Sequence, residues 1–537
     1  MDRRSLLAAL LGLAALAPAA PATDIWKVAP PPPASWKRDR VSDLAARRKA
    51  VAEKIGANAI LILYAAEPRN YAGDVDWPYR QENDFFYLTG IPQEGSALVM
   101  IPGNAGIREI LFMPPSNPSQ ESWTGHLLTA AEGREISGIE TIWDARQLGP
   151  FLAAVLPQAR AIFAPPAASG ARPAIRGEAP APPPIPVDID REFAGRIGSF
   201  GGPDAPVWML RSGSGAAAEY RRERAIASQL GALAPPLAVK DASPVFRRLR
   251  AIKSAREIEL LQHAADITAE GFQRAFAVSI AGAPEYEVQA QFEFTFLRRN
   301  GHWGYPCIVA SGVNATTLHY ETNRDTLPGG GLLLMDDAAE FDGYSADVTR
   351  TIPVSGRFSR EQADVYRLVL AAQKAGIGAA RPGRSPAEVL AAADAVLAEG
   401  LYRLGLIADP KNQREVRIWM NHGISHGIGL NVHDPSTGPE TGYPEYQPGM
   451  VITMEPGLYF RLDALDNLPK TEENAKFIAA SRPAFEKYKG IGVRIEDDIL
   501  ITGGAAKVLS AAIPSELHEV EAAIARLRKA AKPAPPL

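Results

Sequence analysis

The spacing of hydrophobic and polar residues divides the chain into two parts. Between residues 38 and 245, short apolar runs that predict buried strands alternate with longer stretches that predict helices. The predicted strands cover 59–64, 85–88, 97–101 and 207–210, and the predicted helices cover 42–54 and 216–230. This alternation indicates an N-terminal α/β domain, which we place at 38–245.

The second part, residues 246–515, opens with a helix signal. Ser254 and Glu257 form a capping box in front of an apolar run, and Pro284 marks the first turn of another expected helix. From Leu332 onwards the pattern changes to strands and glycines. We therefore expect a second domain in which helices come first and strands follow.

The segments at the two ends and one internal tract lie outside these patterns. Two arginines, an apolar run and a small-residue stretch make residues 1–22 a predicted signal peptide, so we expect an exported protein, periplasmic or secreted. The prolines of residues 23–37 predict a stiff linker, and the tract 165–186 is a proline-rich insertion. Residues 516–537 are expected to hold the end of a helix and a disordered tail.

Composition and charge exclude several functions. Hydrophobic residues make up 46% and charged residues 22% of the chain, which is ordinary for a soluble globular protein. The formal net charge of −4 gives no sign of a nucleic-acid partner, and no apolar run is long enough for a membrane span. The single cysteine, Cys307, lies in an apolar run and predicts a buried thiol rather than a nucleophile.

Two aspartates flank a predicted hairpin in the second domain. The apolar run 332–335 ends in Asp336, and Asp342-Gly343 is a turn signal that leads into an expected strand over 344–354. This turn places Asp336 opposite Thr349, and Asp347 lies two residues from Thr349, so both aspartates point to one face. Their carboxylates can converge on metal ions, whereas two solvated aspartates near a turn is the alternative.

Three further segments carry candidate ligands. His422, His426 and His433 lie within twelve residues that are rich in glycine, which favours a strand or loop packed closely beside a site over a helix. Glu455 and Glu496 each interrupt an apolar strand pattern, where an unpaired charge would be costly. For Glu496 the alternative is an ion pair with Arg494, two residues away on the same face.

These side chains together suit a metal centre. Carboxylates with one imidazole favour Mn²⁺, Co²⁺, Fe²⁺ or Zn²⁺, and four carboxylates exceed the needs of one tetrahedral zinc. Two dications about 3.5–4 Å apart could share a water and lower its pKa to near 7. The resulting hydroxide could attack a peptide carbonyl without a serine or cysteine nucleophile.

At this point the residues resemble a known family. The segments D-D-A-A-E-F-D-G-Y-S-A-D-V-T-R-T, H-G-I-S-H-G-I-G-L-N-V-H-D, T-M-E-P-G-L-Y and G-V-R-I-E-D-D-I-L look like aminopeptidase P, the Xaa-Pro aminopeptidase group. The resemblance runs from about residue 245 to 515, and the stretch R-Q-E-N-D-F-F-Y-L-T-G resembles the N-terminal domain of that group.

The resemblance implies a fold and a set of site residues. The fold would be an α+β pita-bread catalytic domain with a curved, mostly antiparallel sheet and two metal ions, usually manganese. The implied ligands are Asp336, Asp347, His426, Glu455 and Glu496, with Asp347 and Glu496 bridging. The implied catalytic and substrate-binding residues are His319, His422 and His433, with Arg494 supporting the site and His433 steadying the oxygen that gains charge.

The resemblance also implies a reaction, namely hydrolysis of the Xaa-Pro bond in peptides that have proline at the second position, by a homo-oligomer (dimer or tetramer). The alternatives are a prolidase, which shares the five ligands but cuts only dipeptides, and a metal-free member of the fold. Methionine aminopeptidase lacks such an N-terminal domain. The chain departs from compact members in being longer over 460–489 and in carrying the tract 165–186.

Overall fold

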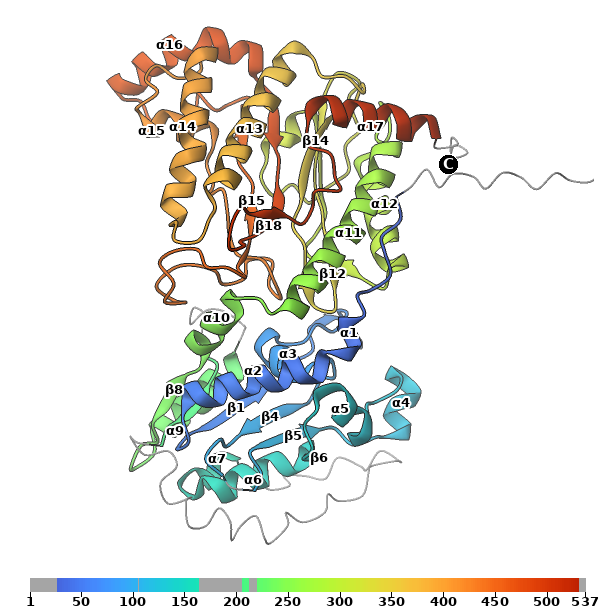
Figure 1. The fold of residues 1–537 in the computed structure, drawn as a ribbon, viewed down its shortest axis with the longest axis vertical. Coiled ribbons are helices and arrows are strands. Elements are labelled where there is room, and N and C mark those ends of the chain that lie inside the picture. The colour runs from blue at the N-terminus through green and yellow to red at the C-terminus, as the bar shows by residue number, and fades with distance from the viewer. Residues whose placement is uncertain (1–26, 105, 164–204, 212–219, 531–537) are drawn as a thin grey trace, which may run out of the picture.

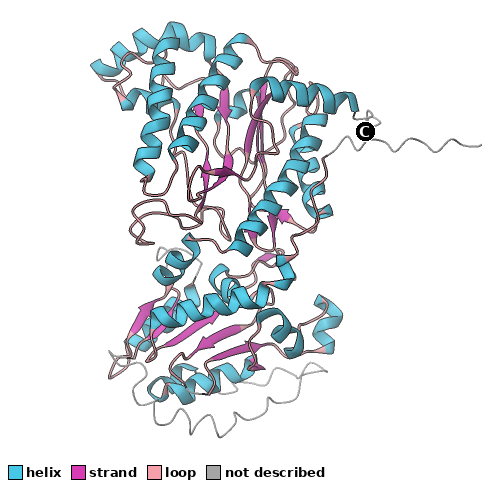
Figure 2. Cartoon of the chain, in the orientation of Figure 1, coloured by secondary structure: helices cyan, strands magenta, loops and turns pink. Residues whose placement is uncertain are grey.

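The computed structural model describes residues 27–104, 106–163, 205–211 and 220–530. The predicted signal peptide, the proline-rich insertion and the predicted tail after residue 530 lie outside these residues. Figure 1 shows the described chain as two domains, one above the other along the long axis of the molecule. The N-terminal domain holds one six-stranded sheet and a short hairpin, and the C-terminal domain holds several smaller sheets flanked by helices (Figure 2).

Six of the described strands form the mixed sheet of the N-terminal domain, in the order β6-β5-β4-β1-β7-β8. They are β1 (Ile60–Tyr64), β4 (Ala97–Met100), β5 (Glu109–Met113), β6 (Ile142–Asp144), β7 (Val207–Met209) and β8 (Val239–Asp241). The pairs of β4 with β1 and β5 are antiparallel, and the other three pairs are parallel. The predicted α/β character of this domain is therefore confirmed.

Helices cover both faces of this sheet because its strands alternate in the direction of their apolar side chains. Leu61 and Leu63 of β1 belong to one buried cluster with Phe85, whereas Ile60 and Ile62 belong to another. The helices are α2 (Arg40–Ile55), α3 (Asn83–Thr89), α4 (Pro118–Thr124), α5 (Ala130–Ser137), α6 (Leu148–Val155), α7 (Arg160–Phe163) and α9 (Arg221–Gly231). A short hairpin of β2 (Asn70–Ala72) and β3 (Val75–Asp76) completes the domain.

The strand predicted over 85–88 is wrong, because these residues belong to helix α3. The carboxylate of Glu82 caps the helix by accepting from the backbone amide of Phe85 at 2.6 Å, and Gly90 ends it in the left-handed conformation. A short apolar run fits a buried strand and a buried helix equally well, so only these caps decide between them.

The segment predicted as a linker over 23–37 is described from Lys27 and packs against the C-terminal domain. The amide of Ala29 donates to the Glu270 carboxylate at 3.0 Å, and the one-turn helix α1 (Ser35–Arg38) places Trp36 with its ring centroid 5.0 Å from that of Phe341. Figure 1 shows this segment running beside α11. The prolines therefore stiffen an extended segment that packs along the C-terminal domain before the chain enters the N-terminal domain.

The helices of the C-terminal domain lie around its sheets. They are α10 (Ser243–Ala251), α11 (Ala255–Val278), α12 (Glu285–Arg298), α13 (Arg360–Ala379), α14 (Pro386–Leu404), α15 (Gln413–Trp419), α16 (Glu472–Tyr488) and α17 (Leu517–Ala530). The capping box of Ser254 and Glu257 and the helix after Pro284 are confirmed. Helices α13 and α14 interrupt the expected run of strands. Each begins with a capping box, at Ser359 and at Ser385, which is a sequence signal for a helix start.

The strands of this domain pair only antiparallel within the described residues, which confirms the expected α+β fold. One sheet has the order β10-β11-β14, a second β13-β12-β9, a third β15-β18-β19, and β16 pairs with β17. The strands are β9 (His302–Trp303), β10 (Ile308–Ser311), β11 (Leu332–Asp336), β12 (Ala339–Phe341), β13 (Tyr344–Ser345), β14 (Thr349–Pro353), β15 (Val451–Met454), β16 (Gly457–Tyr459), β17 (Gly492–Arg494), β18 (Asp497–Leu500) and β19 (Lys507–Val508).

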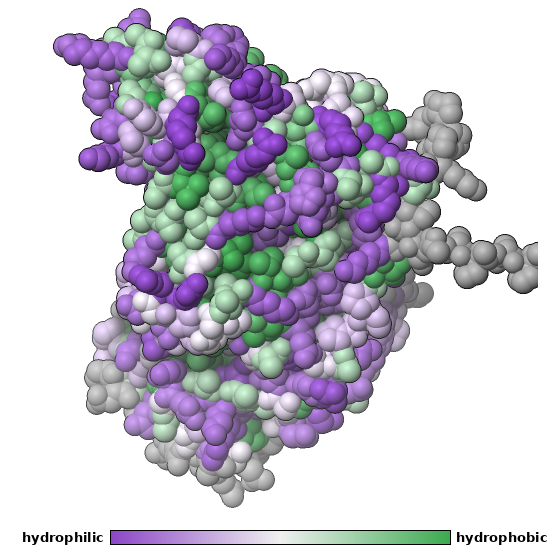
Figure 3. All heavy atoms as spheres, turned by 45° about the horizontal axis from the view of Figure 1, so that its top comes forward, coloured by the Kyte–Doolittle hydropathy of each residue, from purple (hydrophilic) through white to green (hydrophobic). Residues whose placement is uncertain are grey.

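The C-terminal helix α17 is longer than the helix end expected after residue 515. It begins at Leu517, and its buried residues Val520, Ile524 and Leu527 pack in the main core alongside α11. In the view of Figure 3, hydrophilic residues cover most of the C-terminal domain, with hydrophobic residues in recesses between them. Among the described helices, none combines the length and the apolar character needed to cross a membrane.

Candidate metal centre

Strand pairing brings the predicted ligands together from five segments. Met454 of β15 pairs with Asp497 of β18, so Glu455 and Glu496 are the next residues along this ladder and face each other. The sheet that contains β11 and β14 is joined to this ladder at Glu496, whose amide donates to the Thr349 carbonyl at 3.0 Å. Because Thr349 pairs with Asp336 across β11 and β14, as the hairpin predicted, Asp336 reaches the same region.

Asp347 lies where the chain passes from one sheet to another. The single strand expected over 344–354 is wrong, because it divides into β13 and β14. The amide of Asp347 donates to the Asp498 carboxylate at 3.1 Å rather than to a neighbouring strand. This break leaves the Asp347 carboxylate buried, and the Tyr305 hydroxyl links it to Asp336. The two carboxylates therefore lie close together, as the hairpin predicted, although the local structure differs.

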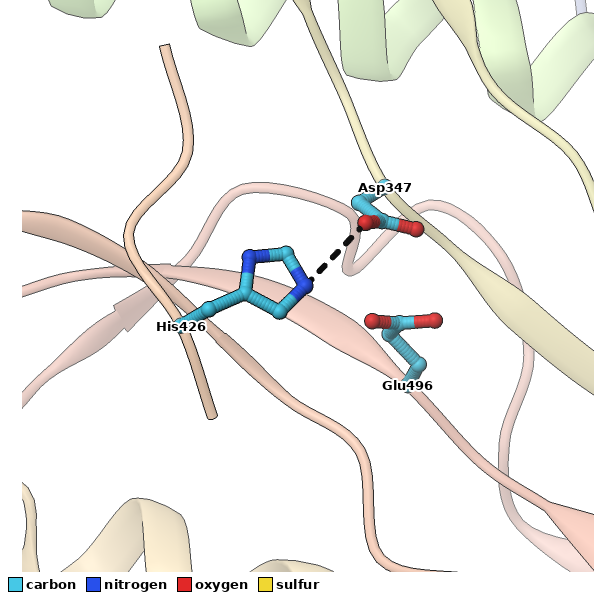
Figure 4. A group of neighbouring side chains, drawn as sticks. All are labelled: Asp347, His426 and Glu496. Carbon is cyan, nitrogen blue, oxygen red and sulfur yellow. Dashed lines mark ion pairs between the residues drawn. The ribbon is translucent and has the colours of Figure 1, made fainter. Parts of the chain in front are cut away.

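His426 completes the group from the glycine-rich loop. The loop is held beside β15 by a bridge between Gly427 and Ile452. The His426 Nε2 atom lies 3.4 Å from Asp347 Oδ2 and 3.5 Å from Glu455 Oε1. Donor atoms of Asp347, His426 and Glu496 all lie within 4.8 Å of one another, and Figure 4 shows these three side chains pointing toward a common space.

Tyr305 links the two aspartates of the group. Its hydroxyl lies 2.6 Å from Asp336 Oδ1 and 2.8 Å from Asp347 Oδ1. A phenol has one proton, so it can donate to only one of the two carboxylates at a time. At any moment one of these two carboxylate oxygens therefore lacks a donor from Tyr305, so it is free to bind a proton or a cation.

Arg494 pairs with Asp336 rather than with Glu496, so the simple Arg–Glu pair that the sequence left open is not formed. The guanidinium contacts the Asp336 carboxylate and donates to the Thr349 hydroxyl at 2.9 Å and the Tyr459 hydroxyl at 3.1 Å. The Thr349 hydroxyl in turn donates to Glu496 at 2.7 Å. Arg494 thereby fixes two acidic side chains, one directly and one through a hydroxyl.

The electrostatics of the group are unfavourable without bound cations. With all four carboxylates ionised, the Arg494 guanidinium and a protonated His426 leave the group with a net charge of −4 + 2 = −2. Two like charges about 4 Å apart repel by about 4 kcal/mol at an effective dielectric constant of about 20, more than one hydrogen bond returns. Burial and the neighbouring carboxylates raise the pKa of Glu496 well above its ordinary value, and burial raises the pKa of Glu455 to about 7.

The three histidines outside the predicted ligand set lie around this group. His422 Nε2 lies 2.9 Å from the Tyr459 hydroxyl, and burial together with Arg494 lowers the pKa of His422 to about 4. The ring centroid of His433 lies 4.3 Å from that of His426, and burial followed by the His426 charge lowers the pKa of His433. His319 is exposed, and its charge contributes to lowering both pKa values.

Several residues of the centre were not found from the sequence. Tyr305, Thr349 and Tyr459 bind the acidic and basic groups through hydroxyls, and Asp498 holds the backbone of Asp347. Hydroxyl residues in strands are common, so their types alone carry no signal. The run of three acidic residues that ends at Asp498, within an apolar strand pattern, was the one available sign.

Comparison with known proteins supplies the family. Residues 259–503 match the family described as metallopeptidase family M24, and residues 44–163 match the aminopeptidase P N-terminal domain. The Xaa-Pro aminopeptidase 1 of Streptomyces coelicolor is 31% identical over 510 residues, which cover 91% of this chain and 88% of that protein. The chain belongs to the aminopeptidase P family of M24 metallopeptidases.

Other relatives agree with this assignment. The Xaa-Pro aminopeptidase of Haemophilus influenzae is 29% identical over 480 residues, which cover 88% of this chain and 95% of that protein. The solved structure of aminopeptidase P from Escherichia coli with the inhibitor Pro-Leu superposes with a TM-score of 0.73 at 28% identity, covering 91% of this chain and 99% of that one. The pita-bread fold that the resemblance implied is therefore confirmed for this metallopeptidase.

The residues present fit the metal dependence of the M24 family. The acidic oxygens and the imidazole are donors that divalent first-row ions accept, and the Tyr305 hydroxyl cannot satisfy both aspartates that it contacts. The net charge of the group also calls for added cations. Among the described residues, Asp347, His426 and Glu496 form a group that could hold a metal ion; Glu455 lies 3.5 Å from His426, and the Tyr305 hydroxyl links Asp336 to Asp347.

These pKa shifts predict how the stability of the metal-free protein depends on pH. Glu455 has a folded pKa of about 7 against an ordinary value of 4.5, so its ionisation favours the unfolded chain as pH rises from 4.5 to 7. Burial alone would lower the pKa of His426, but Asp347 and Glu455 raise it to about 9, so its stabilising contribution is full below 6.5 and lost by about 9.

We therefore expect the free energy of unfolding of the metal-free protein to fall between about pH 5 and pH 9, by on the order of 3 kcal/mol for each group. Added Mn²⁺ should offset the fall, since ions bind the deprotonated ligands. Urea unfolding at several pH values, with and without Mn²⁺, measures both effects, and Glu455→Gln should flatten the metal-free curve. A metal-free stability that stays constant from pH 5 to pH 9 would contradict this electrostatic account.

Proposed function

We propose that this chain is an Xaa-Pro aminopeptidase that removes the first residue from peptides with proline at the second position, using two divalent ions, preferably Mn²⁺, with Co²⁺, Zn²⁺ and Fe²⁺ as alternatives. The observation that carries the proposal is the convergence of the five predicted donor side chains in a C-terminal domain that follows an N-terminal domain of the aminopeptidase P type. Two relatives that match 88% and 91% of this chain are named Xaa-Pro aminopeptidase and Xaa-Pro aminopeptidase 1.

The two ions would be held by the five donor side chains Asp336, Asp347, His426, Glu455 and Glu496, with Asp347 and Glu496 shared between them. When bound, the ions supply a water molecule whose pKa is lowered to near 7 and polarise the scissile carbonyl. Arg494 keeps Asp336 in place through a buried ion pair, and the Thr349 hydroxyl keeps Glu496 in place. The chain therefore contributes fixed ligand positions rather than its own nucleophile.

The histidines outside the ligand set act on the substrate rather than on the metal ions. Because burial and His426 lower the pKa of His433, its ring is neutral near pH 7 and presents one N–H as a hydrogen-bond donor. We assign this N–H to the carbonyl oxygen that gains charge during hydrolysis. His422 is likewise neutral, and with His319 it lines the approach to the ligands. His433 is exposed, as a residue that meets substrate must be.

Two further features complete the proposal. The composition of residues 1–22 supports export, either to the periplasm or out of the cell. We also expect a homo-oligomer, a dimer or a tetramer.

Cleavage assays on the purified protein test this function directly. We expect Xaa-Pro-Xaa tripeptides to be cleaved at the Xaa-Pro bond in the presence of Mn²⁺, with little cleavage of matched Xaa-Ala-Xaa peptides. A chelator should abolish the activity, and Mn²⁺ should restore it. Exclusive cleavage of Xaa-Pro dipeptides would make the chain a prolidase, and no hydrolysis with any added divalent ion would make it a non-peptidase member of the fold.

Replacing His433 tests its assigned task. His433→Ala should retain its metal ions but lose about 10²–10³ in kcat, the usual result of removing one donor to a developing oxyanion. The matched control is His518→Ala, since His518 is exposed on α17, away from the centre, and its replacement should leave kcat unchanged. Kinetics and metal content are measured on the same preparations. A near wild-type kcat would rule out the task, and loss of metal would make His433 a ligand instead.

A further inference from the structure

A buried group of charged residues connects the N-terminal domain to the loop that carries His433. Its centre is Arg250, on the helix α10 that joins the two domains. The Arg250 Nη1 atom donates to Asp84 Oδ1 of the N-terminal domain at 2.6 Å, and Nη2 contacts the Asp434 carboxylate and the Asn431 side chain. One guanidinium therefore holds residues that are 350 positions apart in the sequence, since 434 − 84 = 350.

Asp434 in turn holds the end of the loop against Gly427, the residue after His426. Its second oxygen accepts from Lys253 Nζ at 3.0 Å, and its backbone amide donates to the Gly427 carbonyl at 2.9 Å. The fit is close, because a Cβ on Gly427 would lie 2.2 Å from the Asp434 carbonyl oxygen, and one on Gly429 would lie 2.3 Å from the Asp434 carboxylate. These contacts explain why the loop is rich in glycine, as close packing beside a site predicted.

The charges of this group balance, and all four lie in the interior. Asp84, Arg250, Lys253 and Asp434 are each at most 6% exposed. Burial alone would raise the pKa of Asp434, but Arg250 and Lys253 overcome it and hold the pKa below its ordinary value, so this carboxylate stays ionised. A buried ionic group of this kind contributes less to stability than apolar packing of similar volume would, and its benefit is a defined geometry.

The buried charged group is only one residue away from the metal centre along the chain. Asp434 follows His433, whose ring centroid lies 4.3 Å from that of the predicted ligand His426. A second contact between the domains reaches the same loop, since Arg80 Nη2 donates to the Leu430 carbonyl at 2.7 Å. The N-terminal domain therefore reaches the His433 loop at two points, directly through Arg80 and through Asp84 by way of Arg250.

We propose that Asp84 and Arg250 are positioning residues, through which the N-terminal domain fixes the His433 loop over the metal centre. Asp84 orients the Arg250 guanidinium, Arg250 holds Asp434, and Asp434 sets the backbone from which His433 projects. The N–H of His433 is useful only at a defined place, and a displacement of about 1 Å from its productive position can reduce turnover by about 10². This inference rests on the proposed function only in its effect on turnover.

Asp84→Asn is the sharpest test, because the amide keeps the size of the side chain and a hydrogen-bond acceptor but removes the charge. We expect kcat to fall at least tenfold, with KM changed by less than threefold and a full complement of metal. The matched control is Glu109→Gln, which also neutralises a carboxylate paired with a buried arginine of the N-terminal domain, Arg48, at 2.7 Å. The control should lose stability without losing kcat, since Arg48 contacts Glu109 and the carbonyls of Leu88 and Ser137, none of which lies in the loop.

Hydrogen exchange gives a readout that does not need activity. In Asp84→Asn, peptides that cover 427–434 should exchange at least tenfold faster than in the wild type and in Glu109→Gln. If the wild-type protein cleaves no Xaa-Pro peptide, the proposed function fails while the exchange data still decide the positioning role. Unchanged exchange over 427–434, or a kcat equal to that of Glu109→Gln, would overturn the inference, as would a loss of kcat fully explained by loss of metal.

Discussion

The repulsion between four carboxylates packed into the interior of one domain is the constraint on which the rest of the structure depends. Asp336, Asp347, Glu455 and Glu496 come from strand ends and breaks in three sheets, and a domain that only needed to fold would keep such groups apart. One guanidinium, that of Arg494, offsets part of their charge. Bound cations would offset the remainder, which would link folding of the centre to binding of metal.

The surrounding architecture holds these groups where cations can bind them. Antiparallel pairing sets Glu455 opposite Glu496, and the change of sheet at residues 346–348 frees Asp347 from the ladder and turns it inward. Beyond the ligands, hydroxyl groups of Tyr305 and Tyr459 and the carboxylate of Asp498 fix the orientation of the acidic side chains and of their backbone. The N-terminal domain adds the buried ionic group around Arg250 beside the His433 loop.

The sequence predicted the fold class and the register of the hairpin that carries Asp336, but not every element around it. The turn at Asp342-Gly343 sets the register that aligns Asp336 with Thr349, because a two-residue hairpin turn allows only one pairing of the residues on either side. The run at 85–88 was assigned to a strand because a short apolar segment has no distinctive period, and the caps that make it a helix are single residues. The pairing of Arg494 with Asp336 could not be predicted, since the two residues are 158 positions apart in the sequence and no local pattern links them.

The number of metal ions that the centre binds tests the account most directly. Metal-stripped protein titrated with Mn²⁺ by calorimetry, with metal content checked by elemental analysis, should bind two ions per chain and gain activity as they bind. Glu496→Gln, which removes a carboxylate proposed to be shared by both ions, should bind fewer than two. Full hydrolytic activity in the stripped protein, or an unchanged stoichiometry in Glu496→Gln, would contradict the claim that these four carboxylates exist to hold two cations.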